Sequence, residues 1–99
     1  MGLVSDSFSG TLEGHTITVE ARTGPIAGRF ALKVDGEVQD AIKAVNGEHW
    51  LDGQLPAKDN APSRPFRVKI IVKGAGLFGE EYSMLLDGEE HKLGQGWIL

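Results

Sequence analysis

The sequence predicts an all-β protein, an antiparallel β-sandwich of seven or eight strands with pseudo-repeated halves. Three observations favour this fold: apolar and polar residues alternate along several stretches, glycine-containing turn pairs separate them, and two stretches share one pattern. The chain has 99 residues and no cysteine. We therefore expect a single domain over residues 1–99, stabilised by one hydrophobic core without disulfides.

Period-two alternation marks the expected strands. Successive side chains of a strand point to opposite faces, so each stretch would bury one row and expose the other. The stretches are His15 to Arg22, Arg29 to Val34, Phe66 to Lys73 and Glu81 to Leu86. The turn pairs, which readily adopt positive φ, are Asp35-Gly36, Asn46-Gly47, Asp52-Gly53 and Asp87-Gly88. The aromatic residues Trp50, Phe66 and Trp97 are expected in the core or at its edge.

Residues 38–45 do not follow this alternation. Val38, Ala41, Ile42 and Val45 recur at i, i+3, i+4 and i+7, which is the spacing of an apolar helical stripe. Only nine residues separate the flanking turn pairs, and so short a helix is marginal. A bulged strand is favoured and a short helix is the alternative. Residues 54–65, which contain three prolines, are expected to form a long loop.

The two halves of the chain resemble each other. A shift of 52 residues places Phe30 on Tyr82, Leu32 on Met84 and the turn Asp35-Gly36 on Asp87-Gly88. Two matching units, each with one apolar face, bury those faces best against each other. The repeat therefore favours two packed sheets.

Charge and hydropathy exclude several classes of protein. The net charge of −4 disfavours binding to phosphate backbones, and the basic stretch of Arg64, Arg67, Lys69 and Lys73 is expected to be a solvated strand face. No apolar run reaches the ~18 residues that a membrane helix needs. The first residues lack the basic and apolar regions of a signal peptide. We expect a cytoplasmic protein that binds neither nucleic acid nor membranes.

No motif in the sequence indicates catalysis. No serine lies in a Gly-x-Ser-x-Gly elbow, and the glycine-rich segment 74–79 is followed by too few residues for a dinucleotide-binding helix. We expect no enzymatic activity and no cofactor. A less favoured alternative is a small metal-binding protein or enzyme that uses His15, His49 and His91, because each histidine follows a turn.

Apolar residues in two expected loops give the leading candidate site. Pro25 and Ile26 lie in one loop, and Leu77 and Phe78 lie in the matching loop of the second half. Such residues either close the ends of the sandwich or form a contact patch for a partner protein. The leading hypothesis is a non-enzymatic protein-interaction module that binds through this patch. The alternative is a structural subunit that self-associates through a sheet edge.

Several segments resemble the Fas apoptotic inhibitory molecule family. They are residues 14–20 (GHTITVE), Thr23-Gly24 with Gly28, residues 34–37 (VDGE), residues 81–88 (EYSMLLDG) and the final residues 97–99 (WIL). Together with the strands between them they span more than half of the chain, whereas residues 38–65 depart from the family pattern. The resemblance implies a compact antiparallel β-sandwich that binds another protein inside the cell. It supplies no catalytic residues.

Overall fold

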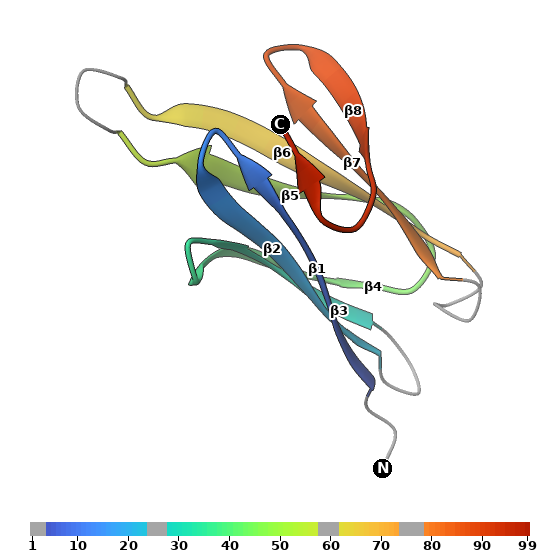
Figure 1. Cartoon of the computed structure of the whole chain (residues 1–99). Coiled ribbons are helices and arrows are strands. Elements are labelled where there is room, and N and C mark those ends of the chain that lie inside the picture. The colour runs from blue at the N-terminus through green and yellow to red at the C-terminus, as the bar shows by residue number, and fades with distance from the viewer. Residues whose placement is uncertain (1–3, 24–27, 58–61, 74–78) are drawn as a thin grey trace.

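A computed structural model describes residues 4–23, 28–57, 62–73 and 79–99, which form nine strands and no helix in two packed sheets (Figure 1). The strands are β1 (Val4–Leu12), β2 (His15–Thr23), β3 (Gly28–Val34), β4 (Glu37–Ala44), β5 (Gly47–Leu55), β6 (Arg64–Val72), β7 (Glu80–Leu86), β8 (Glu89–Leu93) and β9 (Trp97–Ile98). The predicted all-β sandwich is confirmed, with nine strands instead of seven or eight. Within these ranges, no helix is long and apolar enough to cross a membrane.

Each sheet contains four consecutive strands, and β9 adds a fifth strand to one of them. The five-stranded sheet has the order β4-β3-β2-β1-β9, and the four-stranded sheet has the order β5-β6-β7-β8. The chain passes from one sheet to the other between β4 and β5, and its last strand returns to pair with β1 (Figure 1). The β1–β9 pair is parallel, whereas the other pairs of neighbouring strands are antiparallel.

The repeat seen in the sequence is a repeat of structure. Shifting β3 by 52 residues gives the bounds of β7, and both strands are followed by an Asp-Gly turn. Asp35 and Gly36 have φ of 50° and 87°, and Asp87 and Gly88 have φ of 52° and 81°. Positive φ at both central residues fits the twist of the flanking strands. The two hairpins therefore form by the same turn chemistry.

The pair Asp52-Gly53 was expected to be a turn, and this prediction is wrong. Both residues lie within β5, and Gly53 is buried in the sandwich. A Cβ at position 53 would lie 2.5 Å from the Phe66 ring and 2.9 Å from Leu32. Glycine is therefore needed there for close packing between the sheets. β5 extends to Leu55, so the proline-containing connection is shorter than expected.

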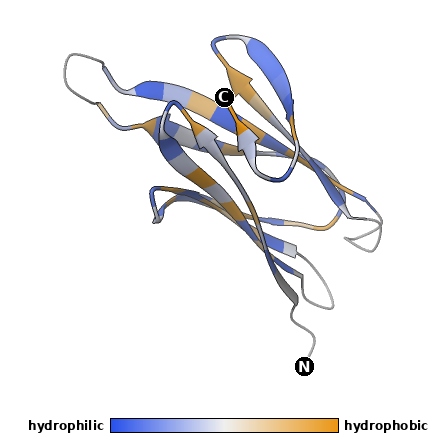
Figure 2. Cartoon of the chain, viewed as in Figure 1, coloured by the Kyte–Doolittle hydropathy of each residue, from blue (hydrophilic) through white to orange (hydrophobic). Residues whose placement is uncertain are grey.

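The core lies between the sheets, and apolar and polar residues alternate along the ribbons (Figure 2). Its fully buried side chains include Leu12, Ile17, Leu32, Leu51, Phe66, Val68, Ile70 and Met84. Trp97 packs at the edge of this core, as expected. Trp50 does not, because it alternates with the buried Leu51 and points outward beneath Arg67, whose guanidinium carbon lies 4.6 Å from the indole centre.

Residues 38–44 lie in the bulged strand β4 and Val45 follows it, so the favoured interpretation of this segment is confirmed. In the β3–β4 pairing, Leu32 lies opposite Asp40 and Lys33 opposite Val38, which leaves Gln39 as an extra residue. A bulge resets the alternation of faces along a strand. The apparent helical spacing arises from this reset, because Val38 precedes the bulge and Ile42 follows it. The side chain of Val38 is 59% exposed, so this segment has no buried helical stripe.

Close packing between Gly10 and Trp97 generates the first prediction. A Cβ at Gly10 would lie 2.2 Å from the indole of Trp97, so the ring rests directly on the backbone of β1. Gly10→Ala should displace the ring and lower the free energy of unfolding by about 1–3 kcal/mol. Urea denaturation would measure this loss.

Gly94→Ala is the matched control, since no atom lies within 4 Å of a Cβ built at that position. Its effect should stay within about 0.5 kcal/mol. Equal stability of the two variants would contradict the close packing of Trp97 on β1.

Candidate binding surface

The predicted loop patch lies outside the described residues. Pro25 and Ile26 fall in residues 24–27, and Leu77 and Phe78 fall in residues 74–78. The strand ends that flank these segments lie at one end of the sandwich. In one sheet, Gly28 pairs with both Thr23 and Ala44. In the other sheet, Val72 pairs with both Gly47 and Glu80. The short β4–β5 connection joins these two rows.

The three histidines make separate contacts. His15 Nδ1 lies 2.8 Å from Asp35 Oδ2, His49 Nε2 lies 2.8 Å from the Asn46 carbonyl oxygen, and His91 Nε2 lies 3.8 Å from Glu89 Oε2. Within the described ranges, no group of three or more His, Asp or Glu side chains is placed to hold a metal ion. The alternative of one metal site built from all three histidines is therefore wrong.

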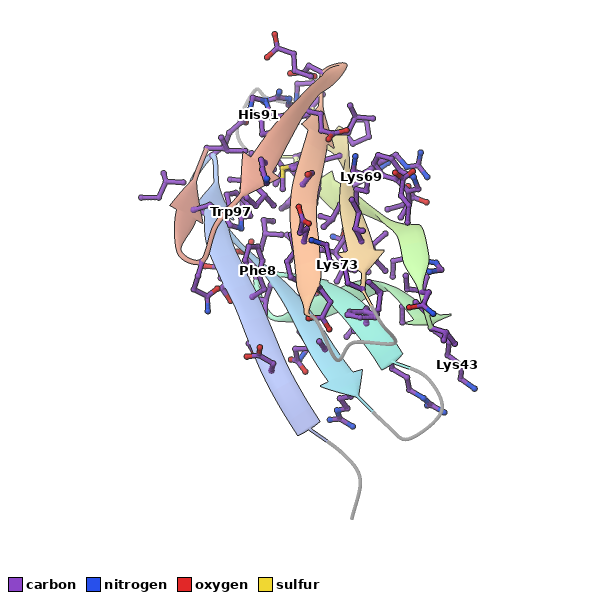
Figure 3. All side chains as sticks on the ribbon, turned by 90° about the vertical axis from the view of Figure 1, so that its right-hand side faces the viewer. Phe8, Lys43, Lys69, Lys73, His91 and Trp97 are labelled. Atoms are coloured by element: carbon purple, nitrogen blue, oxygen red, sulfur yellow. The ribbon has the colours of Figure 1, made fainter. Side chains whose placement is uncertain are left out.

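The outer face of the four-stranded sheet carries charges that neutralise one another. Arg67 Nε donates to Asp52 Oδ1 at 2.7 Å, and Lys69 Nζ donates to Glu90 Oε2 at 2.8 Å. Lys73 and Lys92 both pair with Glu81 (Figure 3 shows Lys69 and Lys73). Arg67 and Lys73 are therefore solvated, as predicted, whereas the Lys69 side chain is only 14% exposed; the charges of all three are compensated within the sheet.

Arg64, the remaining described cation of that sheet, joins the two sheets at their rim. It pairs with Glu13 in the β1–β2 turn and with Asp87 in the β7–β8 turn. The pKa of the Arg64 guanidinium is raised, chiefly by its hydrogen bond to Glu13. This cation therefore has a structural role.

The outer face of the five-stranded sheet has a different charge pattern. Arg22 on β2 lies opposite Arg29 on β3, and Arg29 lies opposite Lys43 on β4. We call these three residues the cationic row. Like charges at directly opposed positions repel and destabilise a sheet. None of the three has an ion-pair partner among the described residues, and Lys43 points away from the ribbon (Figure 3).

Glu20, an acid close to the row, is already paired with Lys33. Glu20 lies two residues before Arg22 on β2, and it accepts a hydrogen bond from Lys33. That hydrogen bond is the main reason why the pKa of Glu20 is lowered; the neighbouring charge of Arg22 contributes less. Glu20 therefore stays ionised, but it leaves most of the positive charge of the row uncompensated.

A shallow groove runs beside the cationic row. It has a volume of about 510 Å³ and is lined from β2, β3 and β4. Ala31 and Ala41 lie opposite each other in its centre, where their small side chains leave the space open. Val38 supplies an exposed apolar wall on the side away from the cationic row. The groove therefore combines apolar surface with positive charge.

Side chains from β4 cover the outer edge of β5. Gln39 Nε2 donates to the Gln54 carbonyl at 3.0 Å, and the Gln54 N–H donates back to Gln39 Oε1 at 2.7 Å. The Asp52 N–H donates to Asp40 Oδ2 at 2.8 Å. These side chains satisfy the backbone groups that another strand would otherwise use.

A second glutamine covers β1 where β9 does not reach. The Ser9 N–H donates to Gln95 Oε1, and Gln95 Nε2 donates to the Ser7 carbonyl, both at 3.2 Å. The Gly96 N–H adds a bond to the Ser9 carbonyl. Edges at opposite sides of the sandwich are therefore covered by side-chain amides, which act against edge-to-edge pairing.

A second groove lies between β1 and the β7–β8 hairpin. Phe8 stacks on Tyr82 with ring centroids 4.1 Å apart, and the carboxyl groups of Asp6 and Glu80 also line the groove. Burial, and to a lesser degree the charge of Asp6, raises the pKa of Glu80. Burial likewise raises the pKa of the Tyr82 phenol, which stays protonated. Folding therefore favours the protonated form of the Glu80 carboxyl group.

Comparison of the chain with protein-family models, curated proteins and solved structures finds no match. The likeness to the Fas apoptotic inhibitory molecule family therefore stays a prediction that rests on the residues quoted above. Among the described residues, the cationic row and its groove form the most distinctive surface of the chain.

Sequence reasoning missed the cationic row, although part of its signal was present. Arg22 and Arg29 lie at equal distances from the centre of the segment that joins β2 to β3, so a hairpin between them places them opposite each other. Lys43 joins the row only because the bulge shifts the register of β4. That shift could not be derived from alternation alone.

The raised pKa of Glu80 generates a pH-dependent prediction. The folded state binds the Glu80 proton more tightly than the unfolded chain does, so ionised Glu80 destabilises the fold above its folded pKa. Glu80→Gln should raise the free energy of unfolding at pH 7 by up to about 1 kcal/mol, because the carboxyl is only partly buried. This gain should shrink as the pH falls towards 4.5, the ordinary pKa of the group.

Glu81→Gln is the control, because it makes the same change in charge but should change the stability in the opposite direction. A hydrogen bond from Lys73 lowers the pKa of Glu81, so its ionised form stabilises the fold at neutral pH. This variant should lose stability at pH 7, and the loss should disappear as the pH falls below the ordinary pKa. Thermal unfolding at a series of pH values would test both variants, and stability changes of the same sign would contradict the opposite pKa shifts of Glu80 and Glu81.

The covered edge of β5 generates a prediction about association. Combining Gln39→Ala with Asp40→Ala removes the three hydrogen bonds to β5, each worth about 1 kcal/mol, and exposes backbone groups of that strand. It also removes the bond that Asp40 accepts from the Ala41 N–H. The double variant should self-associate with rising concentration, as sedimentation velocity would show. In Gln54→Ala the edge stays covered, so this control should sediment like the unaltered protein. A double variant that stays monomeric while folded would show that these side chains do not guard the edge.

Proposed function

We propose that this protein is a non-enzymatic protein-interaction module that binds an acidic segment of a partner across the outer face of β2, β3 and β4. The observation that carries the proposal is the cationic row. Its three cations lie at directly opposed positions on neighbouring strands and have no ion-pair partner in the described part of the chain. The repulsion between them costs stability. A bound acidic segment relieves that cost.

The groove favours a protein over a nucleic acid as the partner. Three phosphate contacts release few counterions, which gives a salt slope of only about −2.7 and weak binding. The net charge of −4 opposes a polyanion at longer range. A protein segment can instead pair acidic side chains with the row and place an apolar side chain against Ala31, Ala41 and Val38.

The covered edges favour this module over the self-associating subunit. Gln39 and Asp40 occupy the edge of β5, and Gln95 occupies the middle of β1. Two edges that a second copy would use are thereby blocked over part of their length. The outer face of β2–β4 offers side chains instead of backbone as the binding surface.

The loop residues Pro25, Ile26, Leu77 and Phe78 stay part of the proposal as a second contact region. The segment that contains Pro25 and Ile26 joins β2 to β3 next to the Arg22–Arg29 pair. A partner bound on the row would extend towards this end of the sandwich. We also propose a cytoplasmic location for this module.

The test compares two triple variants of equal charge change. Arg22→Gln, Arg29→Gln and Lys43→Gln remove the row, while Arg67→Gln, Lys73→Gln and Lys92→Gln remove paired cations of the other sheet. A fluorescein-labelled peptide of Glu, Asp and Leu serves as the probe. Fluorescence anisotropy should show at least about tenfold weaker binding by the row variant, which corresponds to ~1.4 kcal/mol. The control variant should bind like the unaltered protein.

Stability supplies a readout that needs no ligand. Removing the row relieves two like-charge pairs, so the free energy of unfolding should rise by about 0.2–1 kcal/mol per pair. The control variant should lose stability, because it gives up ion pairs. Equal peptide binding by both variants, or a row variant less stable than the control, would contradict the proposal.

A further inference from the structure

We infer that the cationic row is a phosphoryl-binding site, and that the partner segment carries a phosphorylated side chain next to an apolar one. This inference rests on the proposed function and names the chemistry of its ligand. The inference is based on the positive charge that strand pairing concentrates at the row and on the open groove beside the row.

Strand pairing concentrates the three positive charges. Directly opposed residues have Cβ atoms about 4.5–5.5 Å apart, so the row spans ~10 Å across β2, β3 and β4. Five charged side chains line the groove, and Glu20 is the single acid among them. Since Glu20 is held by Lys33, the row has no anion of its own within the described part of the chain.

A phosphoryl group fits this arrangement better than a carboxylate. One carboxylate carries a single charge, so it leaves two of the three cations repelling each other. A phosphoryl group carries about −1.5 to −2 charges at pH 7 and three acceptor oxygens. The guanidinium groups of Arg22 and Arg29 present planar forks of donors that match such oxygens. Lys43 can add a third donor from β4.

The groove defines what accompanies the phosphoryl group. The row at Arg29 and the alanine pair at Ala31 lie two residues apart along β3, which is about 6.6 Å. An extended peptide repeats its side chains on one face at the same interval. A peptide that runs along the strands therefore places an apolar side chain two positions from the phosphorylated residue, over Ala31 and Ala41 and towards Val38.

The experiment compares three peptides that differ at one position. They carry phosphoserine, glutamate or serine, each with leucine two positions away, and their affinities are measured by isothermal titration calorimetry. The phosphoserine peptide should bind at least about tenfold tighter than the glutamate peptide at pH 7.5. Its affinity should fall as the pH drops through the second phosphate pKa near 6.

Protein variants separate the geometry of the row from its charge. Arg29→Lys keeps the charge but removes the fork, so it should reduce the preference for phosphoserine over glutamate. Arg29→Gln should weaken both peptides. Lys73→Gln, on the other sheet, should change neither affinity by more than about twofold, because a screened surface charge contributes little.

The outcomes distinguish this inference from the proposed function. If glutamate and phosphoserine peptides bind equally and both require the row, the interaction module stands and the phosphoryl site is overturned. If neither peptide responds to loss of the row, both proposals are overturned. A single-stranded oligonucleotide is the remaining probe, and tighter binding of it through the row would overturn the choice of a phosphorylated protein segment.

Discussion

The bulge in β4 is the constraint on which the rest of the surface depends. Lys33 lies opposite Val38. If the pairing continued from there without an extra residue, β4 would place Ile42 outward and Lys43 towards the core. The extra residue, Gln39, reverses this alternation, so that Ile42 packs against the core and Lys43 comes to lie opposite Arg29. The same irregularity brings Gln39 and Asp40 together at the edge of β5. One inserted residue thus serves the core, the edge and the charged surface.

The two outer faces use charge in opposite ways. On the four-stranded sheet each described cation has an acidic partner, as Lys69 has in Glu90. On the five-stranded sheet the strand register opposes cation to cation, at a cost in stability that the core between the sheets must offset. Like charges in opposed register break a rule that strand pairing usually follows, and such breaks are expected at functional or strained sites. This contrast connects the fold to the proposed interaction.

Much of the fold followed from local patterns. Alternation at His15 to Arg22 and the Asp35-Gly36 turn gave the strands and hairpins, because a half-buried strand requires period two and a tight turn requires positive φ. Gly53 was misread because an Asp-Gly pair is typical of a turn, whereas here glycine is needed for close packing between the sheets. Trp50 was misread because an aromatic residue does not by itself reveal which face of its strand is inner. The parallel return of β9 to β1 was also missed, since it joins residues distant in sequence.

The sequence by itself determined the strand content, the hairpin turns and the repeat of β3 in β7, since these depend on side chains near one another along the chain. The tertiary structure decided which face of each strand is buried, how β4 shifts its register and which cations become neighbours. Arg29 meets Arg22 and Lys43 only through pairing across strands. Register is a property of two strands together, so no single stretch of residues contains it.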